Sequence, residues 1–324
     1  MTTPSTPPGN AEGTVFLPAV LLSVVAGACM AVQGRANGEL AQVTGNPMEA
    51  SLFSMASGFV ALLLAMVARG PRSGVGRALR ARREGRLHPL WLMSGVLGAV
   101  LLFVQSWVVP LVGVAMFTVA FVAGQTSNAL VIDRFGLGPG GPRPVGPLRI
   151  AAALLAIVGV TLALTGHGTL ALALLPVIAS LLVGMTNMLQ QAWNGQVSVA
   201  SRSVYVGTLT NFGVGTVALI AVVIVQALLG HSLGPAHEAP WWAWTGGLLG
   251  VVFIAVGAWA GRHVGILVFA VMSLLGNLGM AVVLDVLNPA HPGEFGLSRL
   301  LGVVVTFIAA ALATWAGRPR RPAS

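Results

Sequence analysis

The chain has 324 residues, of which 56% are hydrophobic and 8% are charged. Because soluble globular domains carry about 25% charged residues, this composition excludes a soluble domain and indicates a membrane protein. The net charge is +9, and its source is 17 arginines that lie mainly between apolar runs. Arginines in such places are typical topology signals. With no basic module that could read bases, we expect no nucleic-acid partner.

Ten apolar runs follow one another along the chain, each near the ~20 residues that a helix needs to cross a bilayer. We expect helices, because backbone groups in lipid must bond within their own segment, and the alternation of barrel strands is absent. The segment 70–88 after the second run is rich in Gly and Arg and is expected to be a linker. The ten runs lie at 15–36, 47–68, 89–109, 113–133, 147–166, 169–191, 203–229, 241–261, 264–284 and 298–316.

The arginines also predict the orientation. If the N-terminus is cytoplasmic, 15 of the 17 arginines face the cytoplasm, and only Arg35 and Arg299 face outward. The positive-inside rule therefore predicts that both termini are cytoplasmic. Residues 1–14 contain no basic residue and are expected to be a disordered tail, whereas 318–324 are expected to be a basic cytoplasmic tail.

A polar pattern, Gln-x-x-x-Asn-Gly, begins at Gln33 and again at Gln190, 157 residues later. Beyond the second run of each half, the spacing between matches becomes 152 residues. Each half has five runs, so the second half enters the membrane from the opposite side. We therefore predict an all-α integral membrane fold of ten transmembrane helices in two inverted five-helix repeats, 15–166 and 167–317, an arrangement of secondary transporters. The matches at the second spacing are Gly98/Gly250, Trp107/Trp259, Gly113/Gly265, Phe117/Phe269, Gly124/Gly276 and Asp133/Asp285.

A set of small, amide and turn residues in the first half has the order of a known family. Its members are Ala26, Gly27, Gln33, Asn37, Gly38, Gly45, Asn46, Pro47, Ser54 and Gly58, then Gly124, Gln125, Ile132, Asp133, Arg134, Phe135, Gly136, Arg149, Gly159 and Val160. The chain resembles the drug/metabolite transporter superfamily, and most of all its YdcZ-type branch of two-repeat proteins in the bacterial inner membrane. The resemblance covers nearly the whole chain after residue 14. It implies an alternating-access carrier, often an exporter of small metabolites or drugs.

The sequence departs from one property of that superfamily. Its small multidrug members exchange protons for cations through a glutamate in their first helix. Neither the first nor the sixth run of this chain contains a carboxylate. Proton exchange by that route is therefore not expected here.

Amide side chains near the ends of the first and sixth runs form the first candidate site. Gln33 and Asn37 lie one turn apart on one helix face, as do Gln190 and Asn194. Buried polar groups are costly in a membrane and are by default functional, so we expect these four residues to bind substrate in a cavity. Two other interpretations stay open, namely hydrogen bonds between helices and helix termination at Asn-Gly.

Two further matched pairs carry neutral polar groups. Gln125 and Asn277 fall in the fourth and ninth runs, and Asn211 in the seventh run matches Ser54 in the second. We expect Gln125, Asn277 and Asn211 to contribute to substrate binding. The alternative is that these side chains only join helices to one another.

Two matched pairs lie at the ends of runs. Trp107 and Trp259 could stack on a planar or cationic cargo or anchor the helices at the membrane interface. Asp133 and Asp285 end the fourth and ninth runs on opposite faces of the membrane, and they are candidates for gating or coupling. The neighbouring Arg134 suggests that Asp133 instead forms a surface ion pair, which contributes little energy.

The sequence therefore predicts a secondary transporter, an exporter by resemblance, that moves a neutral or weakly polar organic solute between its two repeats. We expect no catalytic residues, metal or cofactor, because the single cysteine, Cys29, and six scattered histidines have no such spacing. The expected partners are a small-molecule substrate and the lipid bilayer, and the expected functional unit is a monomer. A membrane-embedded lipid-modifying enzyme and a non-transporting subunit or sensor are the alternatives.

Overall fold

The computed structural model describes residues 11–67, 69–137, 141–142, 144–165, 170–287 and 296–317. Most of the tails predicted at 1–14 and 318–324 therefore lies outside the described residues. Every regular element within the described ranges is helical.

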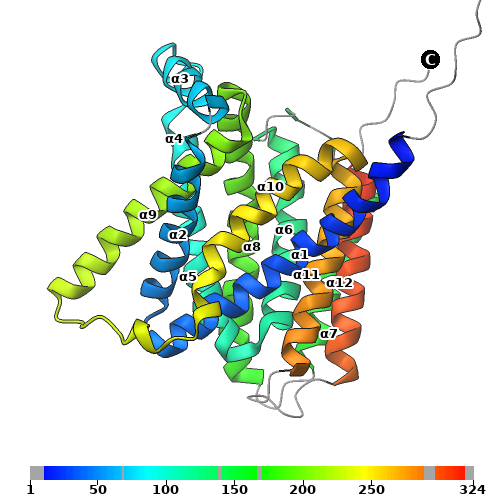
Figure 1. Ribbon diagram of the computed structural model, residues 1–324. Helices are drawn as coiled ribbons and strands as arrows, with labels where there is room; N and C mark the ends of the chain where they lie inside the picture. Colours follow the sequence, from blue (N-terminus) through cyan, green and yellow to red (C-terminus); the bar gives the residue numbers. More distant parts are fainter. Residues whose placement is uncertain are drawn as a thin grey trace, which may run out of the picture.

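The long helices run back and forth across the molecule, and α1 begins and α12 ends on the face that carries α3 (Figure 1). We call this end the α3 face, and we call the opposite end, where α5 turns into α6, the Gly113 face. Two 3-10 turns, Ala236–Glu238 and Trp241–Thr245, precede α10. The α-helices are α1 (Ala11–Thr44), α2 (Pro47–Ala65), α3 (Arg69–Arg83), α4 (Pro89–Leu92), α5 (Ser94–Val112), α6 (Val114–Phe135), α7 (Pro147–Leu164), α8 (Leu170–Ser201), α9 (Val204–Leu228), α10 (Gly246–Val264), α11 (Ile266–Leu287) and α12 (Leu297–Ala316).

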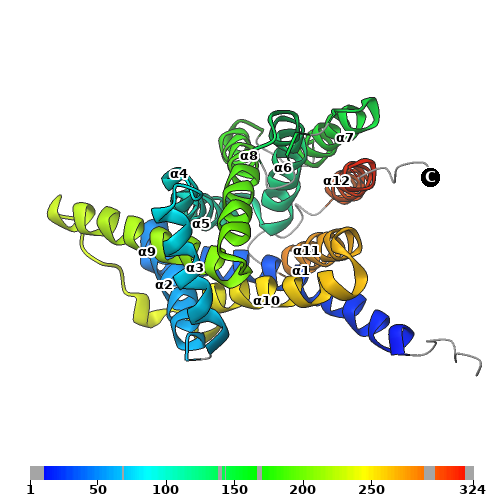
Figure 2. The same ribbon diagram turned by 90° about the horizontal axis from the view of Figure 1, so that it is seen from above.

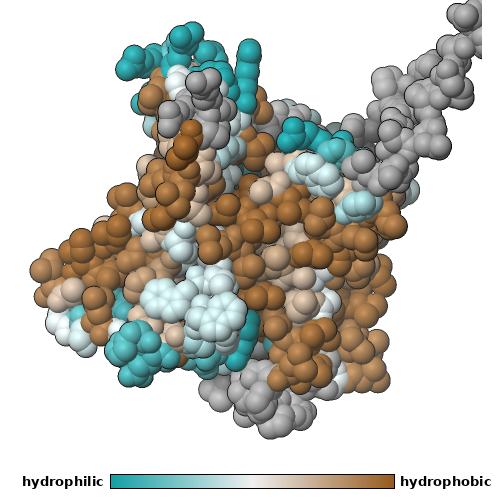
Figure 3. All heavy atoms as spheres, viewed as in Figure 1, coloured by the Kyte–Doolittle hydropathy of each residue, from teal (hydrophilic) through white to brown (hydrophobic). Residues whose placement is uncertain are grey.

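Ten segments of the described chain are helices long and apolar enough to cross a membrane. Many large apolar side chains on these helices are exposed, among them Leu64 and Leu228. Figure 3 shows a broad hydrophobic surface, with hydrophilic atoms gathered mainly toward the two faces. Soluble proteins rarely expose so much contiguous apolar surface, whereas lipid tails cover it at no cost. The prediction of an all-α, ten-span membrane protein is confirmed.

The helices assemble into two groups that each combine both halves of the chain. Helix α1 packs against α10 and α11, and α8 packs against α5 and α6. We call these sets group A (α1, α10, α11) and group B (α5, α6, α8). Figure 2 shows them along two sides of the molecule, with α7 and α12 at one end and α2 and α9 at the other. The two repeats thus exchange helices rather than fold as separate bodies.

Matched glycines hold each group together. A Cβ added to Gly27 of α1 would lie 1.7 Å from the carbonyl oxygen of Ser273, and one added to Gly184 of α8 would lie 2.1 Å from that of Phe121. Gly27 and Gly184 are a matched pair at the first repeat spacing, and Phe121 and Ser273 are a matched pair at the second. Small residues let helix backbones approach closely in a membrane. The same contact therefore occurs once in each group, as inverted repeats require.

Two interpretations of local structure are wrong. Asn37-Gly38 and Asn194-Gly195 do not end helices, because α1 continues to Thr44 and α8 continues to Ser201. The length of an apolar run reflects the thickness of the hydrocarbon layer. A helix can extend beyond that run, and it ends where its backbone groups find partners outside the helix.

The Gly/Arg-rich segment 70–88 is also not an open linker, since it contains α3. In this segment Ala81 and Leu87 are buried beside Val197 of α8, and Val75 and Ala78 pack against the same cluster, whereas Leu79 is exposed. In addition, Arg77 donates a hydrogen bond from Nε to the carbonyl oxygen of Ser201 at 2.7 Å. These contacts with α8 make helix formation favourable despite the poor composition of the segment.

We predict that Gly276→Ala destabilises the protein by about 1–3 kcal/mol, the usual cost of overpacking. A Cβ at this position of α11 would lie 1.9 Å from the carbonyl oxygen of Val24 in α1. Gly279→Ala is the matched control, because a Cβ there meets nothing within 4 Å on the same helix. Thermal unfolding of the purified variants in detergent measures the difference. Equal melting temperatures for the two variants would contradict the packing described here.

Candidate functional site

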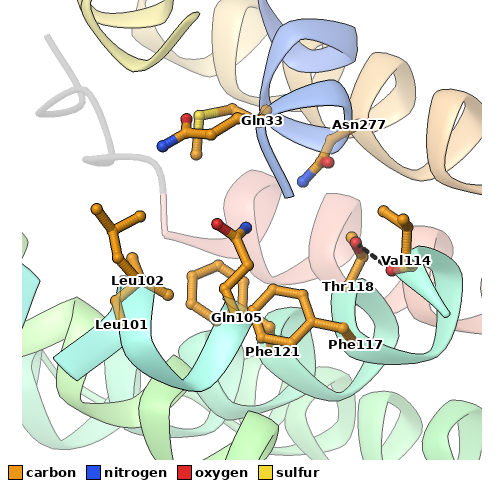
Figure 4. A pocket seen from close by; sticks show the side chains of 10 residues that line it. Gln33, Leu101, Leu102, Gln105, Val114, Phe117, Thr118, Phe121 and Asn277 are labelled. Atoms are coloured by element: carbon orange, nitrogen blue, oxygen red, sulfur yellow. Dashed lines mark hydrogen bonds between the residues drawn. The ribbon is translucent and has the colours of Figure 1, made fainter. Parts of the chain in front are cut away.

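A pocket lies between group A and group B. In this conformation it is small, with a cavity volume of about 30 Å³, which is room for one or two water molecules. In Figure 4 the amides of Gln33 from α1, Gln105 from α5 and Asn277 from α11 approach the same space from opposite sides. None of the side chains that line it is ionisable. The lining residues are Met30, Gln33, Leu101, Leu102, Gln105, Val114, Phe117, Thr118, Phe121 and Asn277.

The apolar wall of the pocket comes mainly from α6. Phe117 and Phe121 are one helical turn apart, and their rings are nearly parallel, with centroids 5.6 Å apart and planes at 17°. Thr118 satisfies its own hydroxyl by donating to the carbonyl oxygen of Val114 at 2.7 Å. The wall therefore presents a pair of aromatic rings and a hydroxyl that is already engaged as a donor.

The polar wall has hydrogen-bond acceptors that lack a partner among the described residues. Asn37 donates from Nδ2 to Oε1 of Gln105 at 3.0 Å, which joins α1 to α5. Oε1 of Gln33 and Oδ1 of Asn37 are buried and have no hydrogen-bond partner among the described residues. A buried acceptor without a partner costs on the order of 1–3 kcal/mol. A bound molecule with a donor could recover that cost at Gln33, which lines the pocket.

A second cluster of amides surrounds α8. Asn187 lies at its centre: Oδ1 accepts from Gln125 at 2.6 Å and from Gln191 at 3.0 Å, and Nδ2 donates to Gln190 at 2.8 Å. Gln190 in turn donates from Nε2 to Oδ1 of Asn211 at 2.9 Å. These bonds connect α6, α8 and α9. Unlike the amides of the pocket, the central amides of this cluster satisfy one another.

The difference between the two clusters follows from sequence differences between the repeats. Asn187 matches Met30, so the first repeat has no amide that could complete the same network. Gln105 matches Gly257, so the second repeat has no amide opposite Asn194. The pocket therefore forms on one side of the pseudo-two-fold axis and a closed network on the other.

The two groups meet at the Gly113 face. Cβ atoms added to Gly34 and Gly38 of α1 would lie 3.0 Å from Gln105 and Val109 of α5, respectively. The equivalent pair at the α3 face is α8 with α10, and these helices do not pack against each other over their described lengths. Of these two equivalent helix pairs, the one at the Gly113 face is in close contact and the one at the α3 face is not.

The two aspartates have partners that differ from those expected. Arg149 of α7, not Arg134, pairs with Asp133, and this arginine is buried. The pair joins α7 to α6. Asp285 of α11 accepts hydrogen bonds from the backbone N–H groups of Val114 and Ala115, each at 2.8 Å. Neither residue is a simple solvated helix end.

Three other predicted residues lie away from the pocket. Trp107 is partly buried against the main apolar core, so it fills space between helices. Trp259 is 37% exposed and lies over His263, with ring centroids 4.5 Å apart. Oδ1 of Asn194 is buried without a partner in the described chain. Of the predicted site residues, only Gln33 and Asn277 line the pocket, and Asn37 reaches it through Gln105.

The sequence search overlooked Gln105, Asn187 and Glu49. Gln105 and Asn187 have no polar counterpart at their matched positions, so a search for symmetric pairs passed over them. Glu49 is 2% exposed, and its carboxylate accepts from the backbone N–H of Gly234 and from Asn46. Each is a polar residue inside an apolar run, and that property alone would have identified all three.

The described residues contain no group of three or more His, Cys, Asp or Glu side chains that could hold a metal ion. The amides of the pocket are also poor ligands by themselves. What the arrangement offers is hydrogen bonding and apolar contact.

Comparison with known proteins identifies the family. The sequence matches the family described as "putative inner membrane exporter, YdcZ" over residues 18–162 and 175–312. The chain belongs to the YdcZ family. The two matched regions correspond to two repeat-like halves of this inner-membrane protein. Membership of an exporter family agrees with a transport role, and the comparisons give no support to a lipid-modifying enzyme or a sensor.

One solved structure, titled "Crystal structure of protein", shares 19% sequence identity with this YdcZ-family chain. The match covers 94% of this chain and 97% of the other, with a TM-score of 0.47. The search of curated proteins found no match.

We predict that Asn187→Ala lowers the free energy of unfolding by about 2 kcal/mol, because it removes three hydrogen bonds worth about 0.6 kcal/mol each. Gln191→Ala is the control, since it removes only one bond of the same network. Equilibrium unfolding of the purified variants in mixed micelles provides the measurement. A loss for Asn187→Ala no larger than that for Gln191→Ala would show that the cluster is not a cooperative network.

Proposed function

We propose that this YdcZ-family protein is a secondary transporter that exports a small, uncharged organic solute by alternating access. The observation that supports this most is the pocket between groups A and B, where amides from both groups face the same space. Substrate sites of inverted-repeat transporters lie at such an interface, near the middle of the membrane. One chain supplies both groups, and we propose that a monomer is sufficient.

The proposed cargo follows from the chemistry of the pocket. Because no ionisable side chain lines it, a charged cargo would lose its hydration without gaining a counter-charge. Gln33 offers an unsatisfied acceptor, which favours a cargo with an N–H or O–H donor. Phe117 and Phe121 form a flat apolar wall that favours a ring or another planar apolar part. Gln105 and Asn277 supply further amide groups, which can both donate and accept.

The proposed transport cycle is a rocking of group A against group B. Each group is held together by close glycine contacts, so it can move as a unit. The contacts between the groups at the Gly113 face would break, and the equivalent contacts at the α3 face would form. Because the two repeats are similar and inverted, the two states would have comparable energies.

The proposed orientation rests on the arginines of the α3 region, where Arg80, Arg82, Arg83 and Arg86 are exposed. By the positive-inside rule, this face and both termini are cytoplasmic. In the conformation described here, the pocket would then be separated from the outside of the cell at the Gly113 face. An exporter must load its cargo in such a state.

We predict that uncharged aromatic compounds with a hydrogen-bond donor stabilise the purified protein, whereas their permanently charged analogues do not. A thermal-shift screen of such matched pairs measures this, and the compounds that bind are then tested for flux in liposomes. Gln33→Leu and Gln105→Leu should each reduce flux roughly tenfold or more, since each removes an amide that faces the cargo.

Gln226→Leu is the control for these variants. It is the same substitution in α9, where the amide contacts Asn46 instead of the pocket. It should transport normally. If Gln33→Leu and Gln105→Leu are folded and transport as well as this control, the pocket is not the transport site. If charged analogues bind as tightly as neutral ones, the proposed cargo class is wrong.

A further inference from the structure

A carboxylate from group A caps a helix of group B at the Gly113 face. Asp285 of α11 accepts from the N–H of Val114 at Oδ1 and from that of Ala115 at Oδ2, both at 2.8 Å. These N–H groups belong to the first turn of α6, where they have no partner within the helix and the helix dipole is positive. Hydrogen bonds to a charged carboxylate are stronger than those between neutral groups. The cap is therefore a strong direct link between the two groups.

The turn before α6 is shaped to receive this carboxylate. Gly113 has a φ of 87°, a conformation that side chains other than glycine rarely adopt. A Cβ added to Gly113 would also lie 2.7 Å from Oδ2 of Asp285. Both the conformation and the space thus require glycine at this position.

The same turn occurs at the α3 face, where no carboxylate of the described residues lies against its glycine. Gly265 matches Gly113, separates α10 from α11 and has a φ of 84°. Nothing lies within 4 Å of a Cβ added to Gly265, as far as the described residues show. Asp133 is the match of Asp285, and it pairs with Arg149 on α7. One of two equivalent turns therefore holds a carboxylate, and the other holds none among the described residues.

We propose that Asp285 and Asp133 are alternating latches of the transport cycle. In the conformation described here, Asp285 holds α6 and keeps the Gly113 face closed. In the other state, Asp133 would accept from the N–H groups of Ile266 and Leu267 at the start of α11 and close the α3 face. This inference rests on the proposed alternating-access function, whose gates it assigns.

The geometry makes the two latches exclusive. Each latch joins α6 of group B to α11 of group A, one at each end of this antiparallel pair. A rocking motion that brings one pair of ends together separates the other. A carboxylate can accept about four hydrogen bonds, so Asp133 can cap α11 and still pair with Arg149. No group has to change its charge for the latches to exchange.

The latches can be tested by the accessibility of the pocket from each side of the membrane. The background variant is Cys29→Ser, which removes the only cysteine of the chain. Thr118→Cys then places a reporter in the pocket. Its rate of reaction with a membrane-impermeant maleimide is measured in vesicles of both orientations. Arg80→Cys on α3 marks the side to which the α3 face is exposed.

Asp285→Asn should increase the labelling rate from the Gly113 face roughly tenfold and decrease the rate from the α3 face, since it weakens the latch that keeps the Gly113 face closed. Asp133→Asn should change the two labelling rates in the opposite directions, with a lower rate from the Gly113 face and a higher rate from the α3 face. Glu39→Gln is the control, because its carboxylate pairs only with Arg35 in the same helix, four residues away, and it should leave both rates unchanged.

Two glycine variants test the same latches without removing a charge. Gly113→Ala places a methyl group against Asp285 and should act like Asp285→Asn. Gly265→Ala carries the same backbone strain, but its methyl group meets nothing in this conformation, so it should act like Asp133→Asn. The pair therefore separates an effect on gating from a general loss of stability.

Opposite changes in the ratio of the two labelling rates for the two latches support the proposal. Changes in the same direction, as general loosening would produce, or no change at all, overturn it. The assay needs no cargo. If the labelling rates change in opposite directions but the protein transports none of the tested solutes, the latches are supported and the proposed function is contradicted.

Discussion

An amide that is buried among hydrocarbon groups without a hydrogen-bond partner costs roughly 1–3 kcal/mol, and much of this structure follows from how that cost is met. Around α8 the central amides avoid this cost because they donate to and accept from one another, through the bonds centred on Asn187. Around the pocket they do not, because Gln33 keeps an unsatisfied buried acceptor beside Gln105 and Asn277. The two sides of the molecule have nearly the same helices, but the amides centred on Asn187 bond to one another, whereas Gln33 presents a buried acceptor to the pocket.

The exchange of helices between the repeats determines which helices can move together beside the pocket. Group A and group B each contain helices from both halves, so a movement of one group against the other displaces helices of the same repeat relative to each other. Close glycine contacts, such as Gly27 with Ser273, stiffen each group internally. The contacts between the groups are fewer and lie toward the Gly113 face, which leaves a natural boundary for motion along the pocket.

Much of the fold could be predicted because the bilayer restricts it so strongly. Ten apolar runs of suitable length could only be helices, and an odd number of runs per half forced the inversion of the second half. The site was harder to predict. Matched pairs pointed to Gln33 and Asn277, which line the pocket, and also to Trp107, which packs against the core. The same method missed Gln105, because its counterpart is Gly257 and symmetry gave no signal there.

The sequence by itself determined the class of molecule, its ten spans, its duplication and the polar residues that needed partners. Each of these depends on the length and composition of local segments, which the hydrocarbon layer selects. Only the tertiary structure decided which amides satisfy one another, which carboxylate caps which helix, and where the two groups of helices are in close contact. Those outcomes depend on contacts between residues far apart in the chain, such as Asp285 with Val114, and on the choice of one of two nearly equivalent arrangements.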